Sequence, residues 1–179
     1  MNQDNISVII PVKDYDYSLK FLLYCLYSQT ILPKEIIIIH SGEGKTEYIN
    51  KVIKNFTKLI KIIYKKVSPL YPGTARNLGV KFSNCKYIAF LDLKTYPKKT
   101  WLEDSLKLLK NDNDVIFGKR LTYADTPFKV NLKYTSYGDK PYTALTGTVI
   151  KKEVFEKNIG TFLNTRAGED IEWINRTEK

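Results

Sequence analysis

Four consecutive isoleucines, Ile36–Ile39, follow Glu35 and constrain the fold of this chain more than any other feature. A strand with one solvent face alternates apolar and polar residues, whereas an unbroken run of branched apolar residues is typical of a strand buried on both faces. Such strands occur mainly in parallel sheets that helices cover. The run therefore predicts a central strand of a helix-covered sheet.

Apolar strands and amphipathic helices alternate along residues 6–118, as a parallel sheet requires. Because crossover connections are right-handed, the carboxyl ends of these strands meet at one edge of the sheet. We therefore predict an α/β fold with a mostly parallel sheet flanked by helices. The expected strands are residues 6–12, 35–39, 59–64, 87–91 and 115–118, and the expected helices are residues 17–29, 49–56, 72–83 and a fourth from Pro97.

The pattern changes after residue 118. Residues 120–140 are polar and aromatic without clear periodicity, so we expect a long loop over the site. We expect one domain, residues 1–179, made of a front half, 1–118, and a back half, 119–179. The elements expected after the loop are a strand over 143–150, a short helix over 151–157, a turn over 164–168 and a last helix from Glu169.

The charge balance favours an anionic partner. The chain has 29 Lys and Arg against 19 Asp and Glu, a net charge of +10. Nucleic acid, acidic lipid headgroups and phosphorylated metabolites all fit this surplus, and lysine usage for solubility explains it as well. With one histidine and two cysteines, a cysteine–histidine zinc cluster is not expected.

The sequence has the features of a cytoplasmic protein. Its longest apolar run, Phe21–Tyr27, is far shorter than the ~20 residues that a membrane-spanning helix needs. The first five residues are polar and include Asp4, unlike a secretory signal. Peripheral contact with the inner face of the membrane stays open.

A carboxylate follows the apolar strand 87–91 directly. Asp92 ends this run, and Lys94 lies two residues further on. Ligands of open α/β sheets bind just outside the carboxyl ends of the strands, where Val12 and Ser41 also lie. We expect these strand ends to line a single crevice. The alternative is a strand-to-loop turn in which the aspartate only accepts backbone N–H bonds.

Two helix starts carry further candidate groups. Gly73 and Arg76 begin the helix over 72–83, where free N–H groups and a guanidinium suit a phosphate; an ordinary helix start with a solvated arginine is the alternative. Glu169 and Asp170 begin the last helix. The helix dipole stabilises acids at this position, and one of them is also a candidate general base.

The order of these segments resembles the inverting family-two glycosyltransferases of the GT-A fold. The similarity runs from residue 6 to residue 176. Its segments are the opening strand Ser7–Val12, the first helix end Leu26–Thr30, the helix start Gly73–Gly79, the strand Ile88–Asp92 that enters the Asp-x-Asp motif, the acceptor-side residues Thr146–Thr148 with Lys151–Phe155, and the catalytic pair in Gly168–Asp170.

The resemblance implies an enzyme of cell envelope polysaccharide or other glycan biosynthesis. It would move a sugar from a nucleotide-sugar, with a UDP-sugar favoured, to a hydroxyl of a saccharide or lipid-linked acceptor, with inversion. The implied catalytic residues are Asp170, as general base, and Glu169. The implied donor-binding residues are Pro11, Val12, Ser41, Gly73, Arg76, Asp92 and Lys94, and the acceptor-side residues are Thr146 and Gly147.

This chain departs from the family pattern in three places. Lys94 stands where the second, metal-binding aspartate of Asp-x-Asp belongs, so either Lys94 contacts the pyrophosphate and partly replaces the ion, or Asp92 still holds Mg²⁺ or Mn²⁺ with help from phosphate oxygens. Like charges ~4 Å apart cost about 4 kcal/mol at an effective dielectric of 20, so we expect weakened metal binding. His40 and Ser41 stand where the family has acids that read the base, and the chain ends at Lys179 whereas family members usually continue.

Two other functions stay open. A sugar-nucleotide or glycan-binding module would remain if the Lys94 change abolished catalysis. A single-stranded nucleic-acid-binding domain would use the tyrosines and lysines between Arg120 and Tyr142 as stacking and ionic groups. The lysines are spread along the whole chain rather than gathered in one motif, so we expect no nucleic-acid partner.

Overall fold

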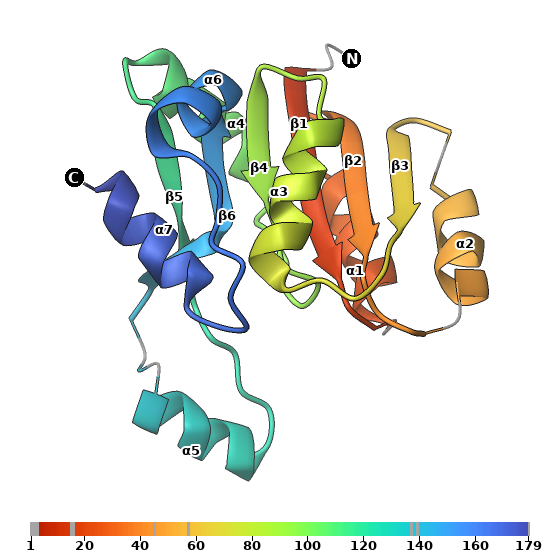
Figure 1. The fold of residues 1–179 in the computed structure, drawn as a ribbon. Helices are drawn as coiled ribbons and strands as arrows, with labels where there is room; N and C mark the ends of the chain where they lie inside the picture. The colour runs from red at the N-terminus through yellow and green to blue at the C-terminus, as the bar shows by residue number, and fades with distance from the viewer. Residues whose placement is uncertain are drawn as a thin grey trace.

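Six strands form one twisted sheet in the computed structural model, which describes residues 4–14, 17–44, 46–56, 58–136, 138 and 140–178 (Figure 1). Their order across the sheet is β3-β2-β1-β4-β6-β5. Strand β6 is antiparallel to both of its neighbours, whereas β1–β4 are parallel. The predicted mostly parallel α/β fold is confirmed. The strands are β1 (Asp4–Val12), β2 (Pro33–His40), β3 (Lys61–Lys66), β4 (Tyr87–Phe90), β5 (Val115–Arg120) and β6 (Tyr142–Lys151).

Helices cover both faces of the sheet. One face packs against α1, α2 and α4, and the other packs against α3, α7 and a π-helix. In Figure 1, α3 and α7 lie in front of the sheet and α1 and α4 lie behind it. The helices are α1 (Ser18–Tyr27), α2 (Thr46–Lys54), α3 (Pro72–Phe82), α4 (Trp101–Lys110), α5 (Pro127–Ser136), α6 (Lys152–Val154), the π-helix Phe155–Ile159 and α7 (Glu169–Thr177). None of the helices in the described ranges has the length and apolarity to span a bilayer.

The isoleucine run is the central strand that its pattern predicts. Ile36 and Ile38 belong to the core under α1, α2 and α4, while Ile37 and Ile39 belong to the core under α3 and α7. All four side chains are 0% exposed. Alternation of side chains across a strand, with helices on both faces, gives every position of the run an apolar environment.

The expected long loop over 120–140 contains a helix instead. Helix α5 stands apart from the sheet in Figure 1, at the end where the parallel strands finish. Pro127 suits the first position of a helix, but Phe128 and Val130 are 78% and 38% exposed. No core-facing stripe was present in the sequence, because this helix packs little of its surface against the sheet.

Two expected boundaries were also wrong. Helix α4 begins at Trp101 rather than Pro97, because the Lys98 and Lys99 carbonyls accept N–H groups of Gln29 (2.8 Å) and Thr30 (3.0 Å) after α1. Because residues 29 and 30 bind these two carbonyls, the segment before Trp101 pairs with the end of α1 and the helix starts after it. Strand β3 runs two residues later than expected, since it is an edge strand whose later lysines are exposed and give no apolar signal.

Candidate functional site

A cavity of about 900 Å³ opens at the carboxyl ends of β1, β2 and β4. Pro11 and Val12 at the end of β1, Ser41 after β2 and Asp92 after β4 all line it. The Ser41 N–H donates to the Val12 carbonyl at 2.8 Å, which holds two of these strand ends together. The prediction that these ends line one crevice is confirmed.

Asp92 is placed by a turn that β6 supports. The Asp92 N–H donates to Thr146 Oγ1 at 3.0 Å, and that hydroxyl donates in turn to Thr95 Oγ1 at 3.0 Å. The Thr95 N–H closes the turn on the Asp92 carbonyl at 3.0 Å. Thr146 is 5% exposed, so its bond to Asp92 is shielded from water. The acceptor-side candidate Thr146 thus also positions a donor-side acid.

Arg76 links the acid at the end of β4 to the first acid of α7. Its Nη2 donates to Asp92 Oδ1 at 2.8 Å and its Nη1 donates to Glu169 Oε1 at 2.9 Å. The Arg76 and Glu169 side chains are each 6% exposed, whereas the Asp92 side chain is 42% exposed. Charge-assisted bonds of this kind are strong and directional. The arginine therefore fixes α3, the end of β4 and the start of α7 relative to one another.

The two adjacent acids of α7 are in different environments. Glu169 lines the cavity and is bound to Arg76. Asp170 is half-buried, accepts the N–H of Ile171 at 2.9 Å and is not among the cavity-lining residues. Of the two acids, Glu169 lines the cavity and Asp170 does not.

Gly73 lets the segment before α7 approach helix α3. A Cβ at this position would lie 2.7 Å from the Leu163 carbonyl oxygen and 2.9 Å from Glu169 Cγ. Next to it, the Thr74 hydroxyl donates to Asn164 Oδ1 at 2.7 Å. Gly73 was expected among the donor-binding residues, but it is not among those that line the cavity. Its observed contacts are with the segment that carries Glu169.

Lys94 and Gly147 also lie outside the cavity lining. Lys94 is exposed in the turn after Asp92. Gly147 has a φ of +87°, which favours glycine, and its carbonyl accepts the Trp101 indole N–H at 2.8 Å. The structure therefore groups Gly147 with the start of α4.

His40 packs into the core next to the site. It is 0% exposed, and its Nδ1 is 2.8 Å from the Tyr64 hydroxyl. Burial lowers the pKa of the imidazole, and the nearby Lys66 charge lowers it further. Of the two residues that replace the expected acids, only Ser41 lines the cavity.

The described residues do not fit a divalent cation held by the protein. They include no group of three His, Cys, Asp or Glu side chains arranged to hold a metal. The Asp92 carboxylate is shared with Arg76 at 2.8 Å, and an ammonium group follows it at Lys94. Mg²⁺ at phosphate sites is usually held by one or two carboxylates together with substrate phosphates and water, and here both carboxylates that line the cavity, Asp92 and Glu169, are bound to Arg76.

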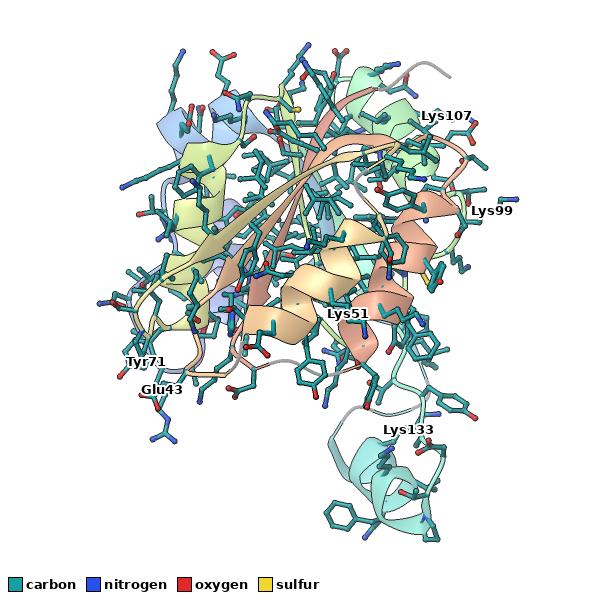
Figure 2. All side chains as sticks on the ribbon, turned by 90° about the vertical axis from the view of Figure 1, so that its right-hand side faces the viewer. Glu43, Lys51, Tyr71, Lys99, Lys107 and Lys133 are labelled. Atoms are coloured by element: carbon teal, nitrogen blue, oxygen red, sulfur yellow. The ribbon has the colours of Figure 1, made fainter. Side chains whose placement is uncertain are left out.

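Several lining residues were missed in the sequence. Tyr71 precedes α3, Lys13 follows β1, and Arg166 lies in the turn before α7. Figure 2 shows Tyr71 at the end of the molecule opposite Lys107, the end at which Glu43 of the β2–α2 loop also lies. The signal that could have found them is position, because each lies in a loop that reaches the edge where the strands end.

Comparison with known proteins identifies the family. A sequence profile described as "Glycosyl transferase family 2" matches residues 7–168. The chain belongs to this family. This family-two chain is 31% identical to an Escherichia coli chondroitin synthase over 137 residues, which cover 74% of the chain and 20% of that protein. It is 28% identical to a Pasteurella multocida hyaluronan synthase over 125 residues, which cover 68% of the chain and 13% of that protein. The chain thus spans a fifth or less of these two relatives.

Solved structures show the same fold. S. aureus TarS 1–349 in complex with UDP-GlcNAc matches with a TM-score of 0.72 and 17% identity, over 96% of this chain and 52% of that one. The complex of the same protein with UDP matches with a TM-score of 0.71 and 18% identity, over 94% of this chain and 53% of that one. At this identity the likeness establishes the GT-A fold alone.

Proposed function

We propose that the chain transfers a glycosyl group from a nucleotide-sugar, with a UDP-sugar favoured, to an acceptor hydroxyl with inversion. The observation that carries the proposal is the cavity in which Arg76 links Asp92 to Glu169 at the carboxyl ends of the strands. Membership of Glycosyl transferase family 2 supports the reaction class. The UDP and UDP-GlcNAc bound by TarS support the donor class.

The donor lies along the cavity with its nucleoside at the β1–β2 end. Pro11, Val12 and Ser41 give this end backbone groups and one hydroxyl. The sugar and diphosphate lie toward Asp92 and Arg76. Asp92 is 42% exposed, so its carboxylate can accept sugar hydroxyls while one oxygen stays on Arg76.

Asp170 acts as the general base. Its carboxylate takes the proton of the acceptor hydroxyl as the acceptor oxygen bonds to the anomeric carbon. The bond from that carbon to the diphosphate oxygen breaks on the opposite face, which inverts the configuration. Glu169 holds Arg76 in place through their buried ion pair.

The acceptor enters beside β6, where Thr146 and Gly147 lie next to the Asp92 turn. A saccharide or a lipid-linked saccharide fits this reaction. The compartment we propose is the cytoplasm, with contact at the inner face of the membrane when the acceptor is lipid-linked.

A donor panel tests the proposal. Purified protein is incubated with UDP-, GDP- and TDP-sugars, and the release of nucleoside diphosphate is measured with and without saccharide acceptors. We expect release from one nucleotide class that an acceptor accelerates. Saturable donor binding without release in any mixture would indicate a binding module instead. Salt-sensitive oligonucleotide binding without donor binding would favour the nucleic-acid function.

A further inference from the structure

The cavity carries more positive than negative charge. Its lining includes the cations Lys13, Arg76 and Arg166 and the carboxylates Asp92 and Glu169. Arg76 is already bound to both carboxylates, at 2.8 and 2.9 Å. The two remaining cations are exposed, and neither has an ion-pair partner within the described part of the chain.

The backbone around both cations is anchored. Arg166 lies in a turn that is tied to α3 through Thr74 and Asn164 at 2.7 Å and closed by a 3.2 Å bond from Thr165 Oγ1 to the Ala167 carbonyl. On the other side, a Cβ at Gly42 would lie 1.4 Å from the Lys13 carbonyl oxygen, so only glycine permits this approach. The side chains of Lys13 and Arg166 therefore both extend from anchored backbone that borders the cavity.

The diphosphate of a nucleotide-sugar needs this charge. Negative charge grows on its oxygens as the sugar leaves, and cations placed there in advance stabilise that change. Both carboxylates that line the cavity, Asp92 and Glu169, are bound to Arg76, and Lys94 stands where the family motif has a second acid. A guanidinium presents paired donors that match phosphate oxygens, and a lysine ammonium acts as a point charge.

We propose that Arg166, assisted by Lys13, binds the donor diphosphate and takes the place of a divalent cation, so that this site binds nucleoside diphosphates without metal. The inference rests on the proposed function. It assigns to Arg166 and Lys13 the neutralisation of diphosphate charge, which in the family pattern a metal bound by the Asp-x-Asp motif provides. Arg166 lies three residues before Glu169 in the chain, and both residues line the cavity.

Calorimetric titration of UDP and of uridine tests this assignment. We expect UDP to bind in EDTA with a Kd within about threefold of its value in excess Mn²⁺. Arg166→Ala should weaken UDP binding by roughly tenfold to a hundredfold, the range of one charge-assisted contact, while uridine binding stays unchanged. Arg166→Lys should fall between, and Lys13→Ala should cost UDP about tenfold. Lys99→Ala removes an exposed charge that does not line the cavity and should leave the binding of both ligands unaffected.

The outcomes separate the inference from the proposed function. UDP binding that Mn²⁺ strengthens more than about tenfold, or that Arg166→Ala leaves unchanged, overturns the inference and leaves the transferase proposal standing. No binding of any nucleoside diphosphate or its sugars, with or without Mn²⁺, overturns the proposed function itself. Thermal unfolding of each variant checks that a weakened titration does not reflect a misfolded protein.

Discussion

Arg76 and Glu169 form an ion pair of 2.9 Å in which each side chain is only 6% exposed. They come from α3 and α7, which are separated by 93 positions in the sequence. Because both charges are buried, each depends on the other for compensation. This pair, extended by Asp92, connects the donor end of the site to the helix that carries the proposed base.

Removing Arg76 should destabilise the whole protein. Arg76→Ala leaves Glu169 buried without a partner, and we expect the free energy of unfolding to fall by about 3–5 kcal/mol in urea denaturation. The double variant with Glu169→Gln should recover part of this loss, since the remaining group is neutral. A single-variant loss below about 1 kcal/mol would mean that the pair is open to water.

Thr146 should affect both stability and turnover. Thr146→Val removes the oxygen that accepts the Asp92 N–H, and we expect a loss of about 1–3 kcal/mol for the unsatisfied group, together with a lower kcat. The matched control is Thr143→Val on the same strand, whose hydroxyl accepts only the exposed Lys119 ammonium. Equal effects of the two variants on kcat would contradict a positioning role for Thr146.

Sequence patterns predicted most of the sheet because burial there is local and regular. The Ile36–Ile39 run and the strand before Asp92 each report their surroundings in consecutive residues. The antiparallel direction of β6 could not be predicted in this way, because strand direction depends on partners distant in the chain. Helix α5 was missed for a related reason, since its exposed Phe128 and Val130 follow no core-facing stripe.

Gly73 should tolerate no larger residue. Gly73→Ala places a Cβ 2.7 Å from the Leu163 carbonyl oxygen, and we expect a cost of about 1–3 kcal/mol in unfolding free energy as the segment before α7 shifts. Gly44→Ala is the matched control, because its Cβ would have only Asp14 Oδ1 nearby, at 3.9 Å. Should both variants unfold at the same urea concentration, the close packing described here is wrong.

His40 should make stability depend on pH. Its folded pKa lies below the ordinary value of about 6.5, chiefly through burial, so below that pH the unfolded chain binds a proton that the folded chain does not. The free energy of unfolding should then fall as the pH is lowered from about 7 to 5, by at most about 1.4 kcal/mol per pH unit from this group.

The variant His40→Gln isolates that contribution. It removes the titrating group at β2, so the difference in unfolding free energy between wild type and variant should shrink as the pH falls from about 7 to 5. Urea denaturation of both proteins at several pH values measures this. A difference that stays constant, or grows, across that range would contradict a lowered His40 pKa.

The site was predictable in its composition but not in its pairings. Val12, Ser41 and Asp92 follow from the rule that strand ends share an edge. The division of labour between Glu169 and Asp170 could not be predicted, because it depends on which carboxylate reaches Arg76. Arg166 was missed because no motif marks it, and only the position of its turn at the edge where the strands end indicates that it borders the cavity.

The kcat of Asp170→Asn, measured with the preferred nucleotide-sugar and acceptor, tests the central claim most directly. Asp104→Asn, an exposed acid in the first turn of α4, is the matched control. The account predicts that Asp170→Asn lowers kcat by about 10²- to 10⁴-fold with donor Kd and stability unchanged, and that the control keeps wild-type kcat. Wild-type turnover by Asp170→Asn would contradict it.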